Sequence, residues 1–402
     1  MNNNKKIIEY IYDIALGNFG VDKFNSLKRS EKSLFIKIIF KSRAHFLIYK
    51  LLKKYEEEYQ EYDYYKKAKD KVNFYTYHSM IHIEESYRLN TILYDNKIKF
   101  VFLKGMHLIN SYYDDLIERP VRDIDILIQK KDLKKVVRIL LECGYRFEYD
   151  VDESSLNSFL INSYDIPILI GKNGSRIEVH FSIENSSKSK ECVFSKRFLD
   201  DSKNIKLGRN LTSVLSTEDL ILHLIYHGLK KQGPDVGIIF VYDIYKVLSS
   251  NKYNDALLLE KASLYKLTPH LKMIVRLLTG KTKEKRLHDL DKKISFNVNS
   301  ETISSLEFLL IRNDIYQEEI RFFKLIEKLR FKKLINNYNQ FSLRRQFKIN
   351  KNENLKIIFS YFYRIFMHIK IIFLLIFRLV FFRSIRLQFF KIKNILRYIN
   401  DF

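Results

Sequence analysis

The segment that decides the fold of this 402-residue chain reads RPVRDIDILI and spans residues 119–128. A residue that precedes proline is pushed out of the α region, so residues 118–122 are predicted to form a loop. The aliphatic run that follows predicts a strand over residues 123–128. Side chains alternate along a strand, so Asp123 and Asp125 share one face, while Ile124 and Ile126 point into the core.

Two neighbouring carboxylates on one face repel each other unless a positive charge lies between them. Mg²⁺ prefers oxygen ligands and commonly binds one or two carboxylates together with substrate phosphates. Two such ions can activate an attacking oxygen and stabilise a leaving pyrophosphate. We therefore predict that Asp123 and Asp125 are catalytic metal ligands, with a two-metal site within reach.

The sequence before this segment suggests a phosphate site. Residues 97–103 predict a buried strand that ends at Lys104 and Gly105, and residues 106–116 predict a helix. Backbone N–H groups at a helix N-terminus bind phosphate, and glycine lets the phosphate approach closely. Lys104, Arg119 and Arg122 could offset the charge of a triphosphate, so these three residues and Gly105 are candidates for nucleotide binding.

The sequence after this segment supplies a third acid. Residues 131–143 predict a helix capped by Gly144, residues 145–149 suggest the start of a strand, and an Asn-Gly turn between residues 166–170 and 176–183 predicts a hairpin. On its second strand, Glu178 and His180 share one face. Glu178 is a candidate metal ligand or general base, and His180 could orient a ligand or contact the nucleotide.

Simpler interpretations stay open at each position. The two aspartates could lie on a solvated edge strand, Glu178 could be merely exposed, and His180 could make only a structural hydrogen bond. His223 and His227 lie four residues apart on a predicted helix, but they lack the glutamate of a metalloprotease motif. We therefore favour helix packing for these two histidines, with Asp243 pairing with one of them or capping the inner end of the cleft.

Helical patterns flank this core. Residues 66–94 contain no Gly or Pro and predict one long helix, and the chain is predicted to become helical again after about residue 204. The predicted fold is α+β, with a small mixed sheet between N- and C-terminal helical regions. The predicted divisions are an N-terminal helical region, a core with the acidic residues, a helical domain that closes the cleft and a basic amphipathic tail, at residues 1–70, 71–205, 206–320 and 321–402.

These motifs together resemble the bacterial uncharacterised nucleotidyltransferase family, which belongs to the DNA polymerase β-type nucleotidyltransferase superfamily. The resemblance covers about residues 70–250 and includes the stretch from Ser216 to Ile244. It implies a palm-like sheet and Mg²⁺-dependent transfer of NMP from an NTP, with ATP the expected nucleotide. Met106 stands where the superfamily commonly has Ser, and the spacing from Gly105 to the aspartates is longer than usual.

The resemblance leaves the acceptor open. One interpretation is a small molecule or glycan precursor in a surface-polysaccharide or natural-product pathway. A second is a protein or tRNA acceptor, as for an AMPylating or toxin–antitoxin enzyme. A third is a non-catalytic, membrane-associated scaffold that keeps the fold.

The net charge of +24 is concentrated near the C-terminus, where residues 321–402 hold 19 Lys and Arg against three acids. Dense Phe and Ile among these charges favour an anionic membrane surface, or packing against the chain, over nucleic acid. The longest uncharged apolar run, residues 371–377, is far shorter than the ~20 residues that span a bilayer. Two cysteines form no disulfide framework, so we expect a cytoplasmic protein that can associate peripherally with the inner face of the membrane.

Overall fold

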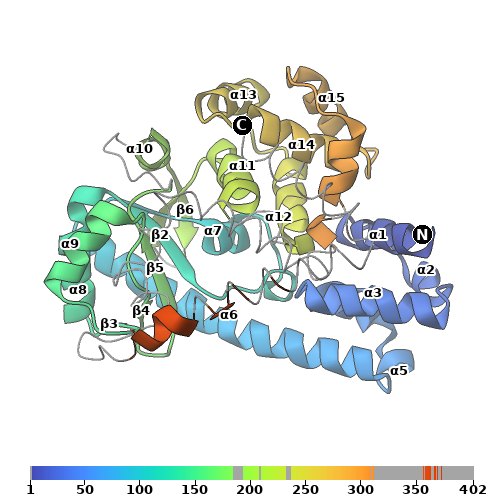
Figure 1. Ribbon diagram of the computed structural model, residues 1–402, viewed down its shortest axis with the longest axis horizontal. Helices are drawn as coiled ribbons and strands as arrows, with labels where there is room; N and C mark the ends of the chain where they lie inside the picture. The colour runs from blue at the N-terminus through green and yellow to red at the C-terminus, as the bar shows by residue number, and fades with distance from the viewer. Residues whose placement is uncertain are drawn as a thin grey trace.

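One mixed sheet organises the chain (Figure 1). The structure is a computed structural model that describes residues 2–183, 193–207, 210–231, 237–307 and 309–311, with scattered positions between 356 and 373. The sheet has seven strands and is flanked by helices, which confirms the predicted α+β class. The strands are β1 (Phe100–Phe102), β2 (Ile124–Ile128), β3 (Arg146–Phe147), β4 (Leu169–Ile170), β5 (Arg176–His180), β6 (Lys203–Leu207) and β7 (Asn210–Val214).

The strands follow the order β3-β4-β5-β2-β1-β7-β6, so β2 lies at the centre. β2 runs antiparallel to β1 and parallel to β5, and all five of its residues are buried. An aliphatic strand interrupted by one acid is stable in this position only if that acid finds a partner.

The predicted hairpin is present. β4 and β5 run antiparallel, with Leu169 opposite Ile177. Gly174 has φ +77°, a left-handed conformation that glycine adopts without strain, so the Asn-Gly pair turns the chain as predicted. The hairpin carries Glu178 and His180 to the centre of the sheet.

The N-terminal part is helical. Helix α6 confirms the predicted long helix and extends it by a few residues at its N-terminus. Figure 1 shows α6 running from α5, beside the N-terminal helices, to the sheet. The helices of this part are α1 (Asn2–Ala15), α2 (Val21–Asn25), α3 (Arg29–Lys41), α4 (His45–Leu52), η1 (Lys53–Tyr55), α5 (Glu56–Tyr59) and α6 (Asp63–Asp95).

Short helices connect the strands. The helix after β1 already begins at Lys104 and ends at Ser111, so the predicted end at residue 116 was wrong, and a separate turn forms at 116–118. Gly144 has φ +88° and ends the helix after β2, as predicted. These elements are α7 (Lys104–Ser111), η2 (Leu116–Glu118), η3 (Lys130–Asp132), α8 (Leu133–Glu142), α9 (Glu153–Asn162) and α10 (Val193–Asp200).

The prediction that the chain becomes helical after about residue 204 was wrong, because the next helix begins only at Thr217. β6 and β7 form an antiparallel pair there, and β7 joins β1 in parallel through Val214 opposite Phe102. Thr212 and Val214 are buried while Leu211 is exposed, so the alternation of a strand is present. The sequence did not reveal this alternation because most residues of β6 and β7 are polar.

The helices after β7 pack on one another and against the N-terminal part, where α1 contacts α12. The Ser216 hydroxyl accepts a hydrogen bond from the backbone N–H of Asp219 at 3.2 Å and so caps the first of these helices. These elements are α11 (Thr217–Ile225), the π-helical turn η4 (Tyr226–Lys231), α12 (Gly237–Ser249), α13 (Asp255–Leu264), α14 (Thr268–Thr279) and α15 (Lys285–Lys293).

The division into four regions stays a prediction, and β6 runs across its boundary between residues 205 and 206. Most of the predicted basic tail at residues 321–402 lies outside the described residues. Among the residues that are described, no helix has the length and apolar character needed to cross a bilayer.

Candidate active site

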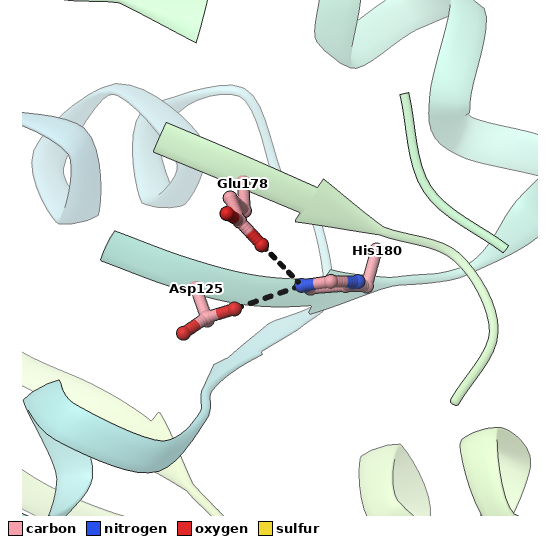
Figure 2. Close-up of side chains that lie close together, drawn as sticks. All are labelled: Asp125, Glu178 and His180. Atoms are coloured by element: carbon pink, nitrogen blue, oxygen red, sulfur yellow. Dashed lines mark hydrogen bonds and ion pairs between the residues drawn. The ribbon is translucent and has the colours of Figure 1, made fainter. Parts of the chain in front are cut away.

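The acidic cluster is built where two central strands lie side by side. In the parallel pair of β2 and β5, Asp125 lies opposite Glu178 and Leu127 opposite His180. Strand alternation turns Asp125, Glu178 and His180 toward one another, as Figure 2 shows. The two strands are far apart in sequence, and their pairing brings together side chains that were predicted separately.

Asp125 is the most enclosed of the acids, with 2% of its surface exposed. Its Oδ1 accepts hydrogen bonds from Lys104 Nζ at 2.7 Å and from His180 Nε2 at 2.8 Å. Burial alone would raise the pKa of Asp125, but the Lys104 charge and the His180 hydrogen bond together hold that pKa well below its ordinary value. The carboxylate is therefore ionised and paired inside the protein.

His180 bridges the two acids. Its Nε2 lies 2.8 Å from Asp125 Oδ1 and 3.5 Å from Glu178 Oε2. Burial acts to lower the pKa of His180, yet its hydrogen bonds to Asp125 and Glu178 raise that pKa above its usual value. Glu178 is the more exposed of these two acids, because its side chain is 30% exposed whereas that of Asp125 is 2% exposed.

Asp123 lies just before β2, where the charges of the same cluster act on it. Its burial, followed by the charges of Asp125 and Glu178, raises the pKa of Asp123 to about 7. Lys104 and Arg119 act in the opposite direction. The two predicted aspartates thus belong to one electrostatic cluster with Glu178, and they are not residues of a solvated edge strand.

The donor set of this cluster suits a divalent cation. Within the described part of the chain, Asp125, Glu178 and His180 each offer a ligand atom, and these three atoms all lie within 4.8 Å of one another. Asp123 falls outside this closest group, so the structure gathers one predicted ligand with Glu178 and with a histidine that we had predicted for nucleotide binding. Oxygen and nitrogen donors at this separation, in a buried setting, fit a metal ion.

Lys104 and Gly105 form the start of α7, next to the cluster. Lys104 has φ +38°, a left-handed conformation that costs a non-glycine residue energy, and its side chain turns to Asp125. A Cβ added to Gly105 would meet only the Val121 methyls, at 3.9 Å. The fold itself therefore does not require glycine at position 105.

The two predicted arginines make protein contacts. The Arg119 guanidinium donates from Nε to both carboxylate oxygens of Asp243, at 2.8 and 3.0 Å, and from one terminal nitrogen to the Pro120 carbonyl. Tyr113 also donates to Asp243, at 2.7 Å. Asp243 thus pairs with Arg119, and the prediction that it pairs with a histidine was wrong. Arg122 lies 5.5 Å from the centre of the Tyr75 ring.

Helix α11 and η4 close one side of the cluster. Lys104 and His180 line a small cavity together with His223, Tyr226 and His227. The His223 ring also packs edge-on against Phe198, with ring centres 5.8 Å apart, which agrees with the predicted packing role. The two histidines therefore combine helix packing with a position at the wall of the candidate site.

Sequence reasoning missed Asp165. This residue bridges to His180 in the sheet, and its Oδ2 lies 4.0 Å from His180 Nδ1. The Ser163 hydroxyl donates to the other carboxylate oxygen at 2.9 Å. The only signal in the sequence is position, because Asp165 comes just before the hairpin strand that pairs with β5.

A comparison with protein families gives a match that covers the candidate site. The model of a family described as uncharacterised nucleotidyltransferase matches residues 28–279, which include every element that contributes to the cluster. A search of curated proteins finds none that matches the chain.

Proposed function

From the membership of this chain in the uncharacterised nucleotidyltransferase family, we propose that it transfers NMP from an NTP, with ATP the expected donor, to an acceptor hydroxyl. Family membership supports a transferase that acts on a nucleotide. The observation that carries the proposal further is the register of β2 and β5, which places Asp125 beside Glu178 in the centre of the sheet.

Mg²⁺ is the proposed cation, held by Asp125 and Glu178 with Asp123 beside them. When bound, such an ion would neutralise the phosphates and polarise the reacting oxygens. The chain's own residues hold the reactants. In the proposed complex, the N–H groups at the start of α7 would bind the phosphates, and the ammonium of Lys104 would pass from Asp125 to a phosphate oxygen.

In the proposed transfer, the acceptor oxygen forms a bond to the α-phosphorus while the bond to the bridging oxygen breaks. Pyrophosphate leaves, and the hydroxyl proton passes to a carboxylate. Glu178, which is more exposed than Asp125, would either take this proton or share the cation. Because the guanidinium of Arg119 is held by Asp243, we assign Arg119 to positioning the loop before β2, next to the charge of Asp123.

The acceptor has two candidate classes. The first is a small molecule or glycan precursor, and the second is a protein or tRNA, which the basic residues 321–402 would then contact. Incubation with each α-labelled NTP and Mg²⁺, in the presence of tRNA, protein or small-molecule extracts, separates them. Label on tRNA or protein would argue against a small-molecule acceptor.

Asp125→Asn tests the site itself. We expect it to abolish Mg²⁺-dependent nucleotide transfer, by about 100-fold or more, because the cation loses a charged ligand. The matched control is Asp200→Asn. It removes an exposed acid at the end of α10 that forms an ion pair with Lys99. If Asp125→Asn leaves Mg²⁺-dependent nucleotide binding and transfer intact, the enzyme proposal is wrong, and the scaffold alternative gains support.

A further inference from the structure

We propose that His180 is itself a ligand of the metal, so that the site is a mixed oxygen and nitrogen site that selects a first-row transition cation such as Mn²⁺ over Mg²⁺. This inference rests on the proposed function, and it replaces Mg²⁺, the cation named there, by Mn²⁺ as the preferred ion. Its basis is the position of the imidazole among the acids, together with the residues that hold the ring.

The imidazole occupies the position of a ligand. Its Nε2 points between Asp125 and Glu178, at 2.8 and 3.5 Å from their nearest oxygens (Figure 2). All three side chains come from paired strands, so their mutual positions are set by the sheet and not by a loop. A cation that contacts both carboxylates here also comes within reach of the nitrogen.

A carboxylate also lies on the other side of the ring, beyond hydrogen-bond distance. Metal-binding histidines commonly direct their second nitrogen to a carboxylate, which fixes the tautomer and the ring orientation. Asp165 Oδ2 lies 4.0 Å from His180 Nδ1, and Ser163 holds the other oxygen of this carboxylate. The Tyr164 ring lies nearly parallel to the imidazole, at 7° and 6.3 Å between centres. For a cation to bind, Nε2 must release the proton that it donates to Asp125, so that a proton kept on Nδ1, on the side of Asp165, leaves the Nε2 lone pair for the cation.

The nitrogen donor determines which cation is preferred. Mg²⁺ binds oxygen ligands and rarely takes imidazole, whereas first-row transition ions gain affinity from nitrogen. Two carboxylates with one imidazole therefore favour Mn²⁺, and its heavier neighbours, over Mg²⁺. Lys104 limits this affinity, because its ammonium lies 2.7 Å from the same Asp125 oxygen and repels an incoming cation.

Electron paramagnetic resonance of Mn²⁺ bound to the full chain tests the assignment without any acceptor. We expect Mn²⁺ to bind about tenfold more tightly than Mg²⁺ and to show magnetic coupling to an imidazole nitrogen. His180→Asn should remove the coupling and weaken Mn²⁺ binding by about tenfold or more, with little change for Mg²⁺. Asp165→Asn should weaken Mn²⁺ binding but keep the coupling, and Lys104→Met should strengthen binding of both ions when no nucleotide is present.

His227→Asn is the matched control, because His227 lines the same cavity but lies outside the group of candidate ligands. Loss of the nitrogen coupling in His227→Asn but not in His180→Asn would overturn the assignment, as would Mn²⁺ bound with no nitrogen coupling. If nucleotide transfer depends on Asp125 but the wild type and His180→Asn bind Mn²⁺ with equal affinity, this inference alone is wrong. Metal and nucleotide binding that survive Asp125→Asn would defeat the proposed function as well.

Discussion

The ammonium of Lys104 balances the charge of Asp125 in the absence of a cation. Two partners at 2.7 and 2.8 Å keep this buried carboxylate ionised, so the acid does not have to take up a proton. The left-handed backbone conformation of Lys104, at the start of α7, is unfavourable by itself and is maintained by the surrounding structure. A residue held in this way is suited to exchange one partner for another when a nucleotide binds.

Substitution of alanine at Gly105 and at Gly228 is expected to have opposite effects on stability. Gly105→Ala should keep the stability or raise it by up to about 1 kcal/mol, because a methyl meets only ordinary contacts and alanine favours a helix. It should nevertheless weaken ATP binding much more than AMP binding, since the phosphates are expected to approach this backbone. Calorimetric titration with both nucleotides measures the difference, and unchanged ATP affinity would remove Gly105 from the phosphate site.

Gly228→Ala has the opposite profile. A Cβ at Gly228 would lie 2.4 Å from an atom of the Phe240 ring, which packs α12 against η4. Urea unfolding should show a loss of about 1–3 kcal/mol. A stability equal to that of the wild type would mean that the contact between η4 and α12 is looser than the structure indicates.

At the scale of elements, the sequence predicted the individual strands of the site better than the contacts between elements that are distant in sequence. Alternation along β2 and β5 predicted which face Asp125 and Glu178 occupy, because strand periodicity is local. The partner of Arg119 could not be predicted, since Asp243 lies 124 residues away and only the packing of α12 brings it near. For the same reason the sheet position of β7, set by its pairing with β1, was missed.

The contact between Arg119 and Asp243 joins α12 to the loop that precedes β2. Asp243→Ala should reduce the free energy of unfolding by about 3–5 kcal/mol, because it leaves a largely buried guanidinium without its carboxylate. Asp200→Ala, at an exposed pair with Lys99, is the control and should cost at most about 1 kcal/mol. Urea unfolding of both variants compares them, and equal losses would show that the Arg119 pair adds nothing beyond a surface contact.

At the scale of the whole molecule, the charge is separated along the chain. The acids of the candidate site lie in the described core, whereas two-thirds of the net charge of +24 falls in residues 321–402. Of the described positions there, Phe359, Phe362, Phe366 and Phe373 are 63–72% exposed. Exposed aromatic residues among many lysines and arginines are typical of segments that bind the interface of an anionic membrane.

This pattern predicts that the full chain cosediments with vesicles that contain phosphatidylserine and not with vesicles of phosphatidylcholine alone. Binding should fall with added salt, because each Lys or Arg near the surface contributes about 1 kcal/mol of screened attraction. A triple reversal to glutamate within the tail should abolish it, at Arg383, Arg386 and Lys391. The control reverses three exposed lysines at η3 and α8, Lys131, Lys134 and Lys135, and should retain binding. Equal loss in both variants would assign the effect to net charge alone, and binding to tRNA in place of vesicles would identify the tail as a nucleic-acid surface.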